Sequence, residues 1–66
     1  MTPKNLKKLR NELGLSVAKA SSQVHITARS WARYESGERP IPEGVVHLFC
    51  LVNGVEPGKY LERNKS

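Results

Sequence analysis

The sequence has few of the features that hold small secreted domains together. Its 66 residues include a single cysteine, Cys50, so no internal disulfide can form. No set of Cys and His residues has the spacing of a zinc site, so we expect no metal and no cofactor. A domain of this size buries only about 60% of the surface of its unfolded chain, so it depends on regular local structure or on oligomerisation.

The sequence also lacks aspartate and long apolar runs. Its longest apolar stretch, Val45 to Val52, is interrupted by His47 and is far shorter than the roughly 20 residues that span a bilayer. We therefore expect a soluble, cytoplasmic protein without a membrane partner. We find no paired carboxylates, no catalytic triad and no phosphate-binding glycine loop, and so expect neither enzymatic activity nor a small-molecule substrate.

The charge is strongly one-sided. Eleven Lys and Arg residues stand against six Glu residues, which gives a formal net charge of +5 and an isoelectric point near 9.8. In so short a chain this excess indicates a polyanionic partner, although net charge by itself does not specify a fold.

Glycine and proline divide the chain into segments of helical length, and no alternating pattern of β-branched residues indicates a sheet. We predict an all-α domain of five helices over residues 1–62, followed by a disordered tail at 63–66. The expected helices run from Thr2 to Gly14, Ser16 to Val24, Thr27 to Gly37, about Pro42 to Asn53, and Pro57 to Glu62.

The fourth of these segments is the most hydrophobic and is the expected central core helix. Its residues Val45, Leu48, Phe49 and Val52 recur at the spacing of one helical face. Val46, Cys50 and Leu51 widen this apolar surface, which we expect the helix to turn toward the core.

The third segment has two faces of opposite character. Trp31 and Tyr34 fall on one side of the helix, and Arg29 and Arg33 fall on the other. Two arginines four residues apart repel each other, and only Glu38 is available nearby to compensate them. The major groove of DNA admits such a helix, and an arginine can bind the guanine atoms O6 and N7 there.

Several motifs together carry a resemblance to a known family. Ser21 is small, Ile26 is branched and apolar, and an aromatic residue occupies position 34. The matching segments are Leu6-Lys7-Lys8-Leu9-Arg10, Gly14-Leu15-Ser16, residues 17–36, and Tyr34-Glu35-Ser36-Gly37-Glu38-Arg39-Pro40. With these motifs the chain resembles the phage repressor and Cro type of helix-turn-helix regulator. Residues 27–37 are also similar to the small autorepressors encoded beside anti-CRISPR genes.

The resemblance implies a compact lambda-repressor-like fold with the second and third helices as the helix-turn-helix. It implies a repressor of transcription that binds double-stranded DNA sequence-specifically, acting as an autoregulator and homodimer on an inverted repeat that overlaps a promoter. It also implies a structural ion pair between Arg10 and Glu35. Two positions depart from the family pattern, because Val17 replaces a frequent Gln and His25 replaces a frequent Gly.

The candidate site residues fall into three groups. The candidate base contacts are Arg29, Arg33, Ala28 and Ala32. The candidate phosphate contacts are Thr27, Ser30, Arg39, Ser16 and Val17, the last two through amides at a helix N-terminus. The apolar residues left over for a dimer surface are Val55, Tyr60 and Leu61, together with exposed parts of the fourth predicted helix.

Two other functions stay open at this point. A protein-interaction module, such as an antitoxin or a repressor antagonist, is favoured by Val17, where a phosphate-binding Gln is missing. The uncompensated Arg29 and Arg33 count against that interpretation. An RNA-binding protein could use the same basic face.

Overall fold

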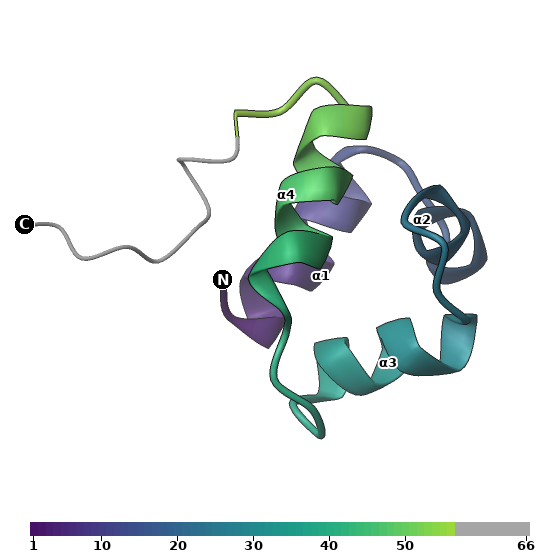
Figure 1. Ribbon diagram of the computed structural model, residues 1–66, viewed down its shortest axis with the longest axis vertical. Helices are drawn as coiled ribbons and strands as arrows, with labels where there is room; N and C mark the ends of the chain where they lie inside the picture. The colour runs from purple at the N-terminus through teal and green to yellow at the C-terminus, as the bar shows by residue number, and fades with distance from the viewer. Residues whose placement is uncertain (57–66) are drawn as a thin grey trace, which may run out of the picture.

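The computed structural model describes residues 1–56, and all regular structure in that part of the chain is helical. It contains four helices, α1 (Pro3–Glu12), α2 (Val17–Gln23), α3 (Ala28–Ser36) and α4 (Glu43–Val52) (Figure 1). The prediction of an all-α domain is confirmed, but the expected count of five helices is not matched, because four are present in this part. The fifth helix and the tail, expected at 57–62 and 63–66, lie outside the described residues.

The first three helices begin at the residues expected to cap them. The hydroxyl groups of Thr2, Ser16 and Thr27 each accept a hydrogen bond, 3.1 Å long, from the backbone amide three residues further on. Each bond satisfies an amide that has no acceptor inside its helix. α3 ends at Gly37, which has a left-handed conformation with φ 85°.

The core lies where α3 and α4 meet the first two helices. The rings of Trp31 and Phe49 pack edge to face, with centroids 4.9 Å apart and planes at 63°. Both side chains are fully buried. They are surrounded by the buried residues Leu6, Leu9, Ala20, Ser21, Val24, Tyr34, Val46 and Cys50.

The predicted buried face of α4 is correct only in part. The helix buries Val46, Phe49 and Cys50, whereas Leu48 and Val52 are exposed and Val45 is half-buried. The physical reason is that α4 is apolar on most of its circumference, so hydrophobic spacing alone does not determine which face turns inward. The packing of Phe49 on Trp31 determines it instead.

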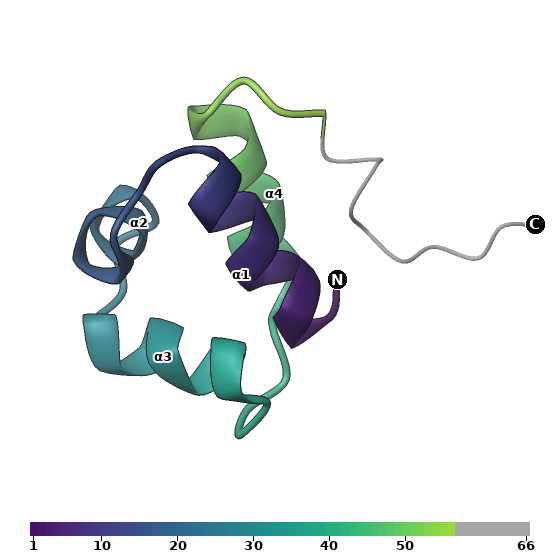
Figure 2. The same ribbon diagram turned by 180° about the vertical axis from the view of Figure 1, so that it is seen from behind.

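The helices enclose the core from different directions. In both views α3 runs along the lower edge of the molecule, while α4 stands upright near the centre and α2 lies to one side of it (Figures 1 and 2). The molecule measures 35 × 26 × 19 Å. Within residues 1–56, no helix is long and apolar enough to cross a membrane.

Candidate nucleic-acid interface

A tight turn joins α2 to α3 and fixes their relative orientation. The amide of Ile26 donates to the carbonyl oxygen of Ser21 at 3.1 Å, and the half-buried Ile26 side chain packs against the core. His25 has a left-handed backbone with φ 60°, the only positive φ outside glycine among the described residues. His25 thus adopts the conformation for which glycine is usually selected. α2, the turn and α3 thus form one rigid unit.

α3 presents one long side to solvent. Trp31 and Tyr34 are buried, and Ala28, Arg29 and Ala32 are exposed, so the predicted two-faced helix is confirmed. No other helix lies beneath α3 in either of the two opposite views, so its outer side is open to a partner (Figures 1 and 2). Exposed alanines beside an arginine permit close approach of another surface.

The two arginines of α3 differ in their surroundings. Arg29 makes no hydrogen bond and no ion pair within residues 1–56. Nε of Arg33 lies 3.8 Å from a carboxylate oxygen of Glu38, and their side chains are 35% and 67% exposed. A pair this exposed contributes little to stability, because water screens it.

Arg39 lies beside that pair. Its backbone amide donates to the carbonyl oxygen of Arg33 at 3.3 Å, which holds the chain after Gly37 against the end of α3. Arg33, Glu38 and Arg39 line a small hollow of about 190 Å³. The structure thus brings Arg39 next to Arg33, as a shared phosphate-binding region requires.

The smaller polar residues at the helix starts are largely occupied by capping. The hydroxyl of Thr27 caps α3 and lies 3.1 Å from the hydroxyl of Ser30, while Ser16 caps α2. The Val17 side chain is half-buried against the core. Any contact from Val17 to a phosphate would therefore use its backbone amide.

A hydrogen-bonded ion pair links α1 to α3 behind this surface. Nε of Arg10 lies 2.6 Å from one carboxylate oxygen of Glu35, and Nη2 lies 3.1 Å from the other. Nη1 of Arg10 donates to the carbonyl oxygen of Leu15 at 2.9 Å. The side chains of Arg10 and Glu35 are only 11% and 10% exposed. The ion pair inferred from the resemblance is thus present in the structure.

Trp31 adds a third partner that the sequence reasoning missed. Its indole Nε1 donates to the carboxylate of Glu35 at 2.6 Å, four residues along the same helix. The sequence contained a signal for this contact, because a Trp and a Glu four residues apart lie on the same face of a helix. The hydrogen bond orients the indole ring as well as the carboxylate.

The pKa values of the pair follow from these contacts. Burial by itself raises the pKa of Glu35, but the hydrogen bonds from Arg10 and Trp31 outweigh it and lower that pKa below its ordinary value. The hydrogen bond to Glu35 raises the pKa of Arg10. Both groups are therefore charged at neutral pH, and Glu35 serves as a structural carboxylate.

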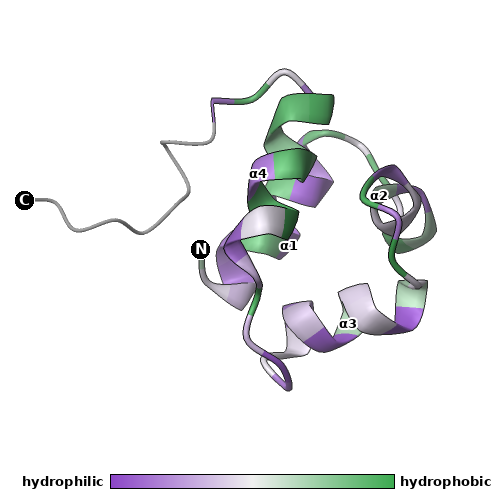
Figure 3. Cartoon of the chain, in the orientation of Figure 1, coloured by the Kyte–Doolittle hydropathy of each residue, from purple (hydrophilic) through white to green (hydrophobic). Residues whose placement is uncertain are grey.

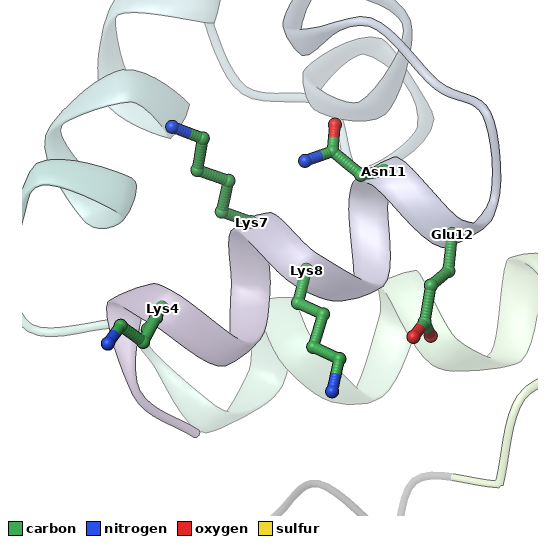
Figure 4. Close-up of a pocket in the computed structure, with 5 residues that line it drawn as sticks. All are labelled: Lys4, Lys7, Lys8, Asn11 and Glu12. Carbon is green, nitrogen blue, oxygen red and sulfur yellow. The ribbon is translucent and has the colours of Figure 1, made fainter.

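A second, larger hollow lies on α1, away from the outer side of α3. It measures about 430 Å³ and is lined by Lys4, Lys7, Lys8, Asn11 and Glu12 (Figure 4). All five side chains come from one face of a single helix, and Lys7 extends toward α3 (Figure 4). No buried polar side chain opens into this hollow, so we interpret it as a solvated basic face.

The remaining predicted residues divide between described and undescribed parts. Val55 is half-buried against the core, and its amide donates to the carbonyl oxygen of Cys50 at 2.8 Å. Tyr60 and Leu61 lie outside the described residues. Cys50 is buried, and burial raises the pKa of its thiol. Among residues 1–56, no group of three or more His, Cys, Asp or Glu side chains could hold a metal ion.

Comparison with known proteins agrees with this geometry. The family model described as a helix-turn-helix domain matches residues 5–60. Comparisons with the curated proteins and with the solved structures gave no match. The family match includes α2, the turn at His25 and α3, and it extends over most of the 66 residues. The chain therefore belongs to the helix-turn-helix domain family.

Proposed function

We propose that the protein is a transcriptional repressor that binds double-stranded DNA through α3. Membership of the helix-turn-helix family supports a DNA-binding regulator. In this proposal α3 enters the major groove with Arg29 contacting the edge of a guanine. Ala28 and Ala32 allow the close approach, and Arg33 contacts a base or a neighbouring phosphate.

One observation carries this proposal. Arg29 is exposed on the open side of α3 and has no carboxylate or other polar partner within residues 1–56. An unpaired guanidinium beside two alanines, on a chain with net charge +5, suits an anionic or acceptor-rich surface. The guanine edge in the major groove presents two acceptors at the spacing of that guanidinium.

The flanking groups position the helix in this proposal. Arg39, Thr27 and Ser30 contact phosphates around the groove, together with amides at Ser16 and Val17. A single α3 contacts only a few base pairs, so the protein acts as a homodimer on an inverted repeat with recognition helices about one DNA turn apart. In this proposal the inverted repeat overlaps the promoter of the protein's own gene, so that binding represses the protein's own transcription.

Selection from random duplexes, followed by fluorescence anisotropy, tests the proposal. The selected duplex is compared with a scrambled duplex and with an RNA of the same sequence. Arg29→Ala should weaken binding to the selected duplex by roughly 5- to 150-fold and binding to the scrambled duplex by much less. Lys8→Ala is the matched control, because it removes an exposed cation from α1.

The competitors distinguish the alternatives. Equal binding of the wild type and Arg29→Ala to the selected duplex contradicts base readout by this residue. Preference for the RNA indicates an RNA-binding protein. Failure of the folded wild type to select or bind any duplex at low salt contradicts the proposal and favours a protein-interaction module.

A further inference from the structure

α4 has a second apolar face that the core does not use. Leu48, Leu51 and Val52 are 38%, 60% and 50% exposed. Among residues 1–56, no other large hydrophobic side chain is exposed. Leu48 follows the buried Val46 by two residues, so it points about 200° away from it around the helix axis. We refer to Leu48, Leu51 and Val52 as the outer α4 face. In a chain this short, three adjacent exposed aliphatic side chains indicate a surface that a protein partner covers.

The charge around this face differs from the rest of the molecule. No Lys or Arg occurs between Arg39 and Lys59, and the only charged residues from 43 to 56 are Glu43 and Glu56. The upper part of α4 is also strongly hydrophobic, whereas α3 is largely hydrophilic (Figure 3). The outer α4 face is therefore unsuited to DNA and suited to another protein surface without excess positive charge.

A second copy of this chain meets that requirement. Two molecules of charge +5 repel each other, and the repulsion is least where each presents its non-basic face. Contact through the outer α4 face brings the segments 43–56 together and keeps the basic surfaces of both copies outward. The same patch then serves both partners, as a two-fold symmetric contact requires.

The position of α4 in the fold also fits a second copy. α4 packs against α2, and Leu48, Leu51 and Val52 lie on the side of the helix opposite its buried residues. α3 runs along the lower edge of the molecule, separate from α4 (Figures 1 and 2). A two-fold axis parallel to α4 would leave both α3 helices at the same edge of the dimer.

We propose that the outer α4 face is the surface through which two copies of this chain associate. The proposal rests on the proposed function for its biological purpose, which is to place two α3 helices on one inverted repeat. It narrows the dimer surface expected from the sequence to the outward side of α4, because Val55 packs against the core.

Sedimentation equilibrium over a range of concentrations tests the contact without DNA. The test variant is Leu51→Gln/Val52→Gln, which makes the two most exposed residues polar and leaves the net charge unchanged. The matched control is Ser22→Gln at an exposed position of α2. Circular dichroism confirms that each variant keeps its helices. We expect the double variant to dimerise at least tenfold more weakly than the wild type and the control.

Titration of duplexes with one and two half-sites gives an independent measurement. The double variant should bind a single half-site with wild-type affinity but should lose cooperative binding of two copies to the inverted repeat. If the wild type binds no duplex, the proposed function fails, while sedimentation still decides the self-association. An unchanged dimer in the double variant, or a wild type that stays monomeric both free and on the inverted repeat, overturns the inference. If deletion of residues 57–66 abolishes the dimer and the α4 substitutions do not, the contact belongs to that segment, and the inference is again overturned.

Discussion

At the scale of single residues, Glu35 is a polar group with a large expected influence on stability. Its carboxylate receives hydrogen bonds from Arg10 and Trp31 in a largely buried position. The neutral substitution Glu35→Gln leaves the Arg10 guanidinium buried without a counter-charge. This should lower the free energy of unfolding by about 3 kcal/mol. Urea unfolding at neutral pH should show this loss. Glu12→Gln is the control, because it removes the same charge from an exposed site, and it should change the unfolding free energy by less than about 0.5 kcal/mol.

The lowered pKa of Glu35 also predicts how stability depends on pH. The unfolded chain takes up a proton at this carboxyl near the ordinary value of about 4.3, while the folded protein does so only at lower pH. Stabilisation by Glu35 is therefore complete above the unfolded pKa and is lost as pH falls through the folded pKa. Thermal unfolding of the wild type should show a falling Tm from about pH 5 downward. The decrease of Tm with falling pH should be smaller for Glu35→Gln than for the wild type. An equal decrease would contradict the assignment of this pH dependence to Glu35.

Glu38 opposes DNA binding in the proposed interface. Its carboxylate lies 3.8 Å from Nε of Arg33 and close to the region assigned to phosphates. Glu38→Gln should strengthen binding to all duplexes alike, by about twofold to fivefold, because it removes a screened repulsive charge. Anisotropy at fixed salt measures the change. The matched variant Glu12→Gln raises the net charge equally on α1, and equal gains in both variants would contradict a local role for Glu38.

At the scale of elements, the sequence predicted the helix starts better than the helix faces. Thr2, Ser16 and Thr27 were correctly predicted as caps because their hydroxyls act on amides only three residues away. The two faces of α3 were also predicted, because arginines and aromatics divide its surface clearly. The buried face of α4 was predicted only in part, since apolar residues surround most of that helix and only its contact with Trp31 selects one side.

The turn between α2 and α3 offers a way to stabilise the fold. His25 has φ 60°, a conformation that costs free energy for any residue with a Cβ atom. His25→Gly should relieve this strain and raise stability by about 0.5 to 1 kcal/mol, or a few degrees in Tm. His47→Gly in α4 is the contrasting variant, because glycine weakens a helix interior and should lower Tm. Differential scanning calorimetry should show shifts of opposite sign, and two decreases would contradict strain at His25.

At the scale of the whole molecule, the net charge overstates the charge available to DNA. Arg10 is neutralised by Glu35, and the lysines of α1 line a different hollow from Arg33 and Arg39 (Figure 4). For the proposed interface, the sequence predicted that Arg29 and Arg33 lie on the opposite side of α3 from Trp31 and Tyr34, because all four residues are close together on one element. It also suggested exposed parts of the fourth helix as a dimer surface, but it did not give the residues, because their exposure depends on how four separate segments pack.

The salt dependence of binding measures how much of that charge is used. In the proposed dimer, Arg33 and Arg39 of both copies neutralise about four phosphates, which predicts a slope of log affinity against log salt near −3.6. Participation of the full charge of both copies would give a slope near −9. Arg39→Gln should make the slope less negative by about 1.8, because one contact is lost from each copy. Lys8→Gln, which removes a cation from the α1 face, should leave the slope unchanged. A large change in the Lys8→Gln slope would show that α1 also contacts the DNA backbone, contrary to the proposed interface.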